Sequence, residues 1–217
     1  MGNKKKSALI LGASGLVGSE VLSLSLESEQ YDKIIIVVRS PLTIKHNKLL
    51  QKTIDFNMPI WEEIFPVDHV YCCLGTTIKK AGSKANFIQV DHDYPLAFAA
   101  AAKKWESSIF SVITAAGVSP NSKIFYNNVK GQLEKKLQSL ALVSTLIFRP
   151  SLLLGERKEF RLGEKIGSGI AKVTSWMTPK TYRAIHCKAV AKAMLAESFS
   201  NKTGFNIISN KAMHQFS

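Results

Sequence analysis

Cysteine is scarce in this sequence of 217 residues, which contains three. Cys72 and Cys73 are neighbours in an apolar stretch, and Cys187 lies far along the chain. Thiols without a spaced pair or an accompanying histidine cluster fit neither a disulfide framework nor a zinc site. We therefore expect buried, reduced thiols, which suit a reducing compartment, and no metal site.

Acidic residues are also few, because 16 Asp and Glu face 29 Lys and Arg and give a formal net charge of +13. Such an excess fits nucleic acid, a membrane surface, or a cofactor and substrate rich in phosphate. The basic residues are spread along the chain without an Arg-rich block or a nucleic-acid motif. This spread favours a diffuse solvated surface, and we do not expect a nucleic-acid partner.

Long apolar runs are missing as well, so no segment is expected to span a bilayer. The apolar residues that follow Lys6 are interrupted by glycines, which argues against a signal peptide. From these absences we expect a cytoplasmic protein. The length gives room for one sizeable core, and we expect a single domain over residues 1–217.

Three glycines at three-residue spacing form the most informative motif. Gly12, Gly15 and Gly18 follow an apolar run, residues 8–11, and precede a stretch with helical periodicity. A strand, a glycine turn and a helix in this order suit a dinucleotide pyrophosphate, because the helix N-terminus offers free N–H groups to an anion. A purely structural turn is the alternative. The predicted cofactor-binding residues of this loop are Gly12, Ala13, Ser14, Gly15, Leu16, Val17 and Gly18.

The end of the second expected strand, residues 33–38, indicates which dinucleotide binds. NAD-selective sites usually have an acid there for the ribose 2′-hydroxyl, whereas this chain has Arg39 followed by Ser40. A guanidinium would clamp a 2′-phosphate, with Ser14 as a second donor. Asp55, at the end of a third strand over residues 52–56, would reach the adenine region; the alternative is a helix cap or a solvated turn residue. We predict NADP(H) in preference to NAD(H); the alternative for Arg39 is an ordinary surface arginine.

The alternation of apolar strands with helical segments predicts an α/β fold with a doubly wound parallel sheet, the Rossmann fold. We expect further strands over residues 68–75, 108–114, 144–150 and 204–208, with helices over 19–28, 59–65, 125–140 and 188–198, a helix ending near 104, and a basic loop at 79–84. Ligands bind beyond the carboxyl ends of parallel strands. The predicted cofactor contacts there are Leu74, Gly75, Thr76 and Pro150, and residues 155–185 form a small substrate-side insertion.

Tyr126 and Lys130 lie four residues apart on an expected helix and therefore share one face. A free phenol has a pKa near 10, and an ammonium group beside it favours the phenolate. The same Lys130 would bind the nicotinamide ribose. Thr114, 12 residues before Tyr126, would hydrogen-bond a substrate carbonyl from the end of a strand. These three residues predict a reductase site; the alternative is a half-buried tyrosine beside a solvated lysine.

Four segments in register resemble the Tat-interacting-protein oxidoreductase family, a branch of the atypical short-chain dehydrogenase/reductases. They are YCCLGTT (71–77), VDHDY (90–94), YNNVKG (126–131) and FRPSLL (148–153). The resemblance implies an NADP(H)-binding Rossmann domain, with Tyr126 and Lys130 as the Tyr/Lys pair and Thr114 at the position of the active-site serine. Two differences stand out: Ala115 and Ala116 leave a single hydroxyl there, and Asp91 replaces the asparagine of many relatives in the wider superfamily.

The sequence thus predicts an NADP(H)-dependent oxidoreductase that transfers hydride to a small carbonyl or similar substrate. The alternative is an NADP(H)-binding regulatory protein that acts through protein partners with little or no turnover. A small-molecule substrate is expected, while a protein partner and a homodimer are left open.

Overall fold

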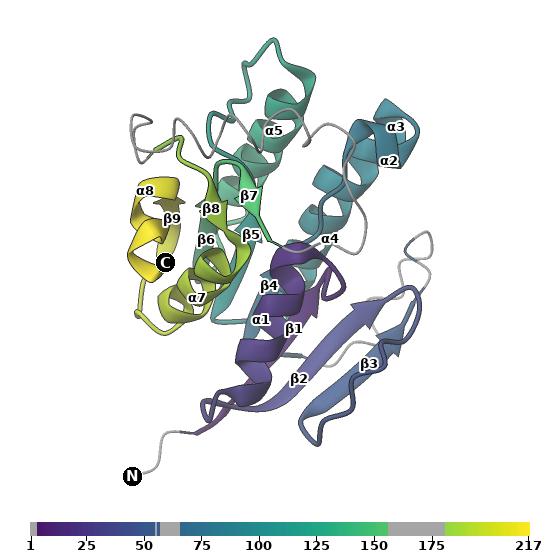
Figure 1. Cartoon of the computed structure of the whole chain (residues 1–217), viewed down its shortest axis with the longest axis vertical. Coiled ribbons are helices and arrows are strands. Elements are labelled where there is room, and N and C mark those ends of the chain that lie inside the picture. Colours follow the sequence, from purple (N-terminus) through teal and green to yellow (C-terminus); the bar gives the residue numbers. More distant parts are fainter. Residues whose placement is uncertain (1–3, 55, 57–65, 156–180) are drawn as a thin grey trace.

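A seven-stranded parallel sheet forms the centre of the protein, in the order β3-β2-β1-β4-β5-β6-β9 (Figure 1). The structure is a computed structural model that describes residues 4–54, 56, 66–155 and 181–217. The strands are β1 (Lys6–Leu11), β2 (Tyr31–Val38), β3 (Leu49–Thr53), β4 (His69–Cys72), β5 (Ile109–Ile113), β6 (Ser144–Arg149) and β9 (Gly204–Ser209). The winding direction reverses between β1 and β4, which is where such sheets bind ligands at their carboxyl ends.

Helices cover both faces of the sheet (Figure 1). One face carries α1 (Leu16–Glu27) and α7 (Cys187–Ser198), and the other carries α4 (Tyr94–Lys104) and α5 (Phe125–Ser139). The smaller elements are α2 (Ile78–Ala81), α3 (Lys84–Ile88), the π-helix η2 (Gln89–Asp93), α8 (Asn210–Met213), the 3-10 helix η3 (His214–Phe216), and the paired strands β7 (Leu153–Leu154) and β8 (Ile185–His186). None of the described helices is long and apolar enough to cross a membrane.

β1 shows why these residues form a central strand. Ala8 and Ile10 belong to the core beneath α1 and α7, whereas Leu9 and Leu11 belong to the core on the opposite face. Side chains alternate between the faces of a strand, so a strand that is covered on both faces must be apolar throughout. The predicted doubly wound α/β sheet is confirmed.

The third strand lies earlier than predicted. β3 begins at Leu49, not at residue 52, and ends at Thr53. It forms an edge of the sheet, and its side chains are only half-buried or exposed. An edge strand has a weak apolar signal for this reason, so its register could not be read from the sequence. Asp55 and the helix predicted at residues 59–65 lie outside the described residues, as does most of the predicted insertion at 155–185.

The loop predicted at residues 79–84 is wrong, because the structure has two short helices there, α2 and α3. The side chain of Thr77 accepts a hydrogen bond from the Lys80 N–H, and that of Ser83 accepts one from the Asn86 N–H. Gly82, at φ +76°, ends α2. These capping residues are the sequence signal for the two helices.

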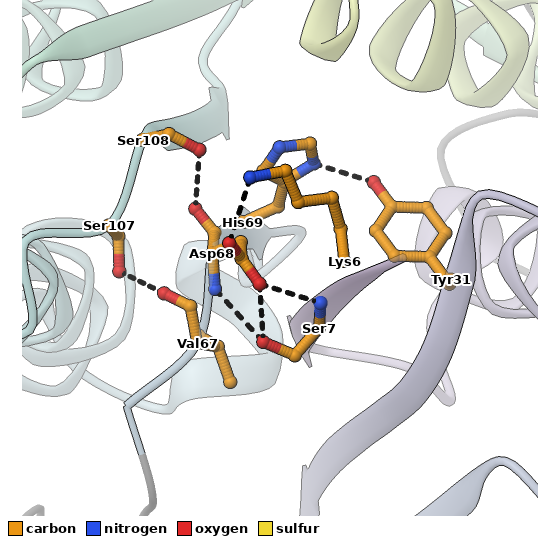
Figure 2. Close-up of polar contacts among 8 residues, drawn as sticks. All are labelled: Lys6, Ser7, Tyr31, Val67, Asp68, His69, Ser107 and Ser108. Atoms are coloured by element: carbon orange, nitrogen blue, oxygen red, sulfur yellow. Dashed lines mark hydrogen bonds and ion pairs between the residues drawn. The ribbon is translucent and has the colours of Figure 1, made fainter. Parts of the chain in front are cut away.

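Polar side chains join the amino ends of the strands, at the edge opposite the carboxyl ends (Figure 2). Asp68 accepts hydrogen bonds of 2.8 Å from both the N–H and the hydroxyl of Ser7, and it pairs with Lys6 at 3.0 Å. The buried His69 lies beside it, with Nδ1 at 2.7 Å from the Tyr31 hydroxyl. These contacts hold β1, β2 and β4 together where they begin.

Candidate dinucleotide and catalytic site

The glycine turn packs so closely that side chains are excluded from it. A Cβ on Gly18 would lie 2.1 Å from the carbonyl oxygen of Gly12. A Cβ on Gly12, which has φ +75°, would lie 2.6 Å from the carbonyl oxygen of Cys73. The turn closes through a 2.8 Å hydrogen bond from the Gly15 N–H to the Gly12 carbonyl. β1, α1 and the end of β4 therefore meet at a distance that only glycine allows.

The start of α1 fits an anionic group. Gly15 is its N-cap and supplies no side-chain hydrogen bond, so the N–H groups of the first turn have no side-chain acceptor. Ser14 and Gly15 are exposed, whereas Ala13 and Val17 are buried and offer only their backbone. An uncapped helix start beside a tight glycine turn suits a pyrophosphate, so the residues present fit a dinucleotide.

Arg39 and Ser40 directly follow β2 and are exposed. Because β2 pairs in parallel with β1, Arg39 emerges at the same edge of the sheet as the glycine turn. This is the edge to which the 2′-position of an adenosine ribose would come in a doubly wound fold.

The ends of β4 and β6 also lie at this edge. Leu74 packs against the core, and Gly75 is exposed. The carbonyl oxygen of Pro150, a buried residue, accepts a 2.8 Å hydrogen bond from the Ala116 N–H. The ends of β5 and β6 are thereby tied together beside the predicted catalytic residues.

Lys130 is buried and forms an ion pair that the sequence analysis did not predict. Its Nζ lies 2.9 Å from Oδ1 of Asp91, and these side chains are 3% and 1% exposed. The ammonium also donates to the carbonyl oxygen of Ile113 at 3.4 Å. Burial alone would lower the pKa of Lys130, but the carboxylate of Asp91 and, to a smaller extent, Tyr126 raise it above its ordinary value. The lysine is therefore a fixed cation at neutral pH.

Tyr126 lies one turn before Lys130 on α5 and is half-buried. Its ring packs against the buried ring of Phe87 on α3, with centroids 5.6 Å apart. The short helix α3 thus forms one side of the surroundings of Tyr126.

Thr114 is buried just after β5, and its hydroxyl is already engaged. It donates a 2.6 Å hydrogen bond to Oε1 of the buried Glu134, whose carboxylate also binds Arg149 through Nε at 3.0 Å and through Nη2. A carboxylate only accepts hydrogen bonds, so Thr114 has to be the donor. Its oxygen keeps the capacity to accept from another group.

Asp91 and Glu134 are the two site residues that sequence reasoning did not assign. Glu134 follows Lys130 by four residues, so Tyr126, Lys130 and Glu134 form one stripe along α5. That spacing was available as a signal. The pairing of Asp91 with Lys130 depends on a π-helix and could not be read from helical periodicity.

Comparison with curated proteins finds clear relatives. The chain is 33% identical over 220 residues to the protein HTATIP2 of Rattus norvegicus, spanning 97% of this chain and 88% of that protein. It is 38% identical over 172 residues to FMP52-2 of Scheffersomyces stipitis, spanning 77% and 75% of the two chains. A scan against protein-family models finds no match.

Solved structures share the fold at low sequence identity. The Bordetella bronchiseptica enzyme WbmH, solved in complex with NAD+, superposes with a TM-score of 0.72 at 18% identity, covering 95% of this chain and 76% of that one. The UDP-glucose 4-epimerase of Thermotoga maritima, solved with UDP-glucose, gives 0.72 at 16% identity, with 97% and 81% covered. These likenesses establish the Rossmann-type architecture.

The relatives correct the expected cytoplasmic location. FMP52 proteins of Eremothecium gossypii, Scheffersomyces stipitis and Candida albicans carry names that place them in mitochondria. The sequence argument for the cytoplasm relied on missing segments and reduced thiols, and neither distinguishes one reducing compartment from another.

Proposed function

Because the chain belongs to the family of HTATIP2 and FMP52, a branch of the atypical short-chain dehydrogenase/reductases, we propose that it is an NADP(H)-dependent oxidoreductase acting on a small carbonyl or alcohol. One observation carries the proposal. The tight glycine turn contacts the end of β4 at Cys73, and Gly75, two residues on, lies over the charged pair of Lys130 and Asp91. The glycine turn, which suits a pyrophosphate, and the Lys130–Asp91 pair, which suits a nicotinamide ribose, therefore both contact the segment that ends β4.

Different residues would bind different parts of the cofactor. Gly12 to Gly18 would hold the pyrophosphate with the first turn of α1, Arg39 and Ser14 the 2′-phosphate, and Lys130 the nicotinamide ribose. Leu74, Gly75, Thr76 and Pro150 would line the remaining length, and Asp55, which lies outside the described residues, would reach the adenine region as the sequence predicts. When bound, the cofactor supplies or accepts a hydride.

The chemistry assigned to the protein is proton transfer and orientation. Tyr126 would exchange a proton with the substrate oxygen, beside the ammonium of Lys130. The proton of Thr114 is held by Glu134, so Thr114 would orient the substrate as a hydrogen-bond acceptor. The hydroxyl of an alcohol can donate a hydrogen bond to such an acceptor. The alcohol is the substrate of the oxidation and the product of the reduction.

The first test is a calorimetric titration of the purified protein with NADPH and NADH. Arg39→Ala should weaken NADPH binding at least tenfold, because a charge-assisted contact to a phosphate is lost, and should leave NADH nearly unchanged. Lys104→Ala is the matched control, since it removes an exposed cation at the far end of α4. Failure of the wild-type protein to bind either nucleotide at millimolar concentration would refute the proposal.

A second candidate is an NADP(H)-binding regulatory protein with little or no turnover, acting through a protein partner or as a homodimer. The engaged hydroxyl of Thr114 favours it, because Ala115 and Ala116 supply no replacement donor. A panel of aldehydes and ketones, with the matching alcohols, separates the candidates. Turnover that Tyr126→Phe abolishes without weakening NADPH binding supports the enzyme, and no turnover with any compound supports the regulator.

A further inference from the structure

The helix that precedes α4 contains an irregularity at the candidate site. α3, η2 and α4 follow one another without a break from Lys84 to Lys104, and η2 is a π-helix. π-Turns inside α-helices are rare and are frequently found at functional sites. This one carries Asp91, whose side chain is 1% exposed. A carboxylate removed from water to this extent is costly unless it is paired.

Both oxygens of Asp91 contact the site. Oδ1 lies 2.9 Å from Nζ of Lys130, and Oδ2 accepts a 2.8 Å hydrogen bond from the backbone N–H of Thr76. Between these contacts passes Gly75, where a Cβ would lie 3.5 Å from Oδ1 of Asp91 and 3.9 Å from Nζ of Lys130. One carboxylate therefore connects η2, α5 and the turn that follows β4.

The charge of Asp91 keeps the buried Lys130 protonated. A buried ammonium tends to lose its proton, and Asp91 is the anion that opposes this loss at Lys130. The other titratable neighbours are Tyr126 on α5 and Cys72 on β4, and burial raises the pKa of Cys72 to about 12, so that this thiol is neutral.

The geometry of the ammonium points in the same direction. An ammonium has three N–H donors. Its contacts are the ion pair with Asp91 at 2.9 Å and a hydrogen bond of 3.4 Å to the carbonyl of Ile113. These two contacts hold the ammonium in place and leave donor capacity for a ligand.

We propose that Asp91 is a positioning residue that fixes the ammonium of Lys130, so that the ammonium can donate to the nicotinamide ribose. Asp91 also couples this contact between Lys130 and the ribose to the turn at Gly75 and Thr76. The inference rests on the proposed function, because it assumes that Lys130 binds this ribose. It predicts that Asp91 affects only ligands that carry the nicotinamide half. A ligand confined to the adenosine half would use the glycine turn and Arg39 and would not depend on Asp91.

Two ligands test this distinction. NADPH carries both halves, whereas 2′,5′-ADP lacks the nicotinamide mononucleotide half but keeps the 2′-phosphate and one 5′-phosphate. We expect Asp91→Asn to weaken NADPH binding roughly tenfold or more, as for the loss of a contact to a charged group, and to change 2′,5′-ADP binding less than twofold. Asp93→Asn is the matched control from the same π-helix, since Asp93 is 57% exposed and pairs with His92. It should change neither affinity.

A second pair of variants covers the case in which Asp91→Asn does not fold. Lys130→Met should produce the same selective loss for NADPH, and Asp91→Asn combined with Lys130→Met, which leaves no unpaired buried charge, should lose no more than Lys130→Met alone. Equal losses for both ligands in Asp91→Asn, no loss for either, or a much larger loss in the double variant would overturn the positioning role. Failure of the wild-type protein to bind either ligand would instead refute the proposed function, and this inference with it.

Discussion

The stability of this protein should depend on pH through a histidine that lies far from the candidate site. His69, at the start of β4, is 2% exposed, and its Nδ1 lies 2.7 Å from the hydroxyl of Tyr31. That hydroxyl lies 2.6 Å from the hydroxyl of Tyr71. Burial lowers the pKa of His69 to about 4, from an ordinary value of 6.5. The folded state therefore favours the neutral imidazole.

The size of the effect follows from this difference. Between pH 6.5 and about 4 the unfolded chain binds a proton at His69 that the folded protein does not. The stability contribution is thus complete above pH 6.5 and is lost as the pH falls toward 4. A difference of about 2.5 pH units, at about 1.4 kcal/mol for each, corresponds to roughly 3.5 kcal/mol. This is a sizeable share of the roughly 5–15 kcal/mol that stabilises a typical domain.

Urea denaturation of the wild type and of His69→Gln, measured at several values of pH, isolates this contribution. The glutamine amide is neutral throughout and can accept a hydrogen bond from Tyr31, so the variant should lack about 3.5 kcal/mol of the pH-dependent change in stability. The titration of Asp68 falls outside this pH range. Burial raises the pKa of Asp68, but the hydrogen bonds from Ser7 and Lys6 lower it to about 2, and both this value and the ordinary value of 3.8 lie below the range in which His69 acts. His46→Gln, at an exposed histidine, is the control. Parallel stability curves for wild type and His69→Gln would refute the reasoning.

Two further predictions concern the site. Gly18→Ala should destabilise the protein by more than about 3 kcal/mol in thermal denaturation, because the turn has no room for a Cβ placed 2.1 Å from the Gly12 oxygen. The control Gly82→Ala, at φ +76° with open space around it, should lower the stability by only about 1–2 kcal/mol through backbone strain. A larger loss for Gly82→Ala than for Gly18→Ala would contradict the packing argument. Glu134→Gln should cost roughly 2–4 kcal/mol in urea denaturation, somewhat below the value for a fully buried pair because the Arg149 side chain is 30% exposed. The control Glu197→Gln, which breaks the surface pair with Lys202, should lower the free energy of unfolding by less than about 1 kcal/mol. An equal loss of stability in Glu134→Gln and Glu197→Gln would show that the Thr114–Glu134–Arg149 group is not a structural unit.

The sequence was sufficient for the parts of the fold that depend on local periodicity. β1, β2 and α5 could be predicted because central strands are apolar throughout and because a long helix shows its buried stripe. β3 was misplaced because an edge strand buries little. α2 and α3 were missed because helices of four and five residues are defined by their caps, not by periodicity.

The candidate site divides in the same way. The glycine turn is a local motif, and the structure shows in distances why Gly12 and Gly18 carry no side chain. The partners of the predicted catalytic residues are distant in the sequence: Asp91 lies 39 residues before Lys130, and Glu134 lies 20 residues after Thr114. Which acid meets which cation depends on how α5 packs against η2 and β6, and no spacing rule in the sequence states that.

The end of β4 links the two halves of the site by contacts that need no ligand. On one side the carbonyl of Cys73 closes on Gly12, and on the other the N–H of Thr76 binds Asp91, which binds Lys130. A shift of this strand end would therefore move the glycine turn and the lysine together. If Lys130 and the glycine turn bind a dinucleotide as proposed, the end of β4 would set the spacing between the pyrophosphate and the nicotinamide ribose.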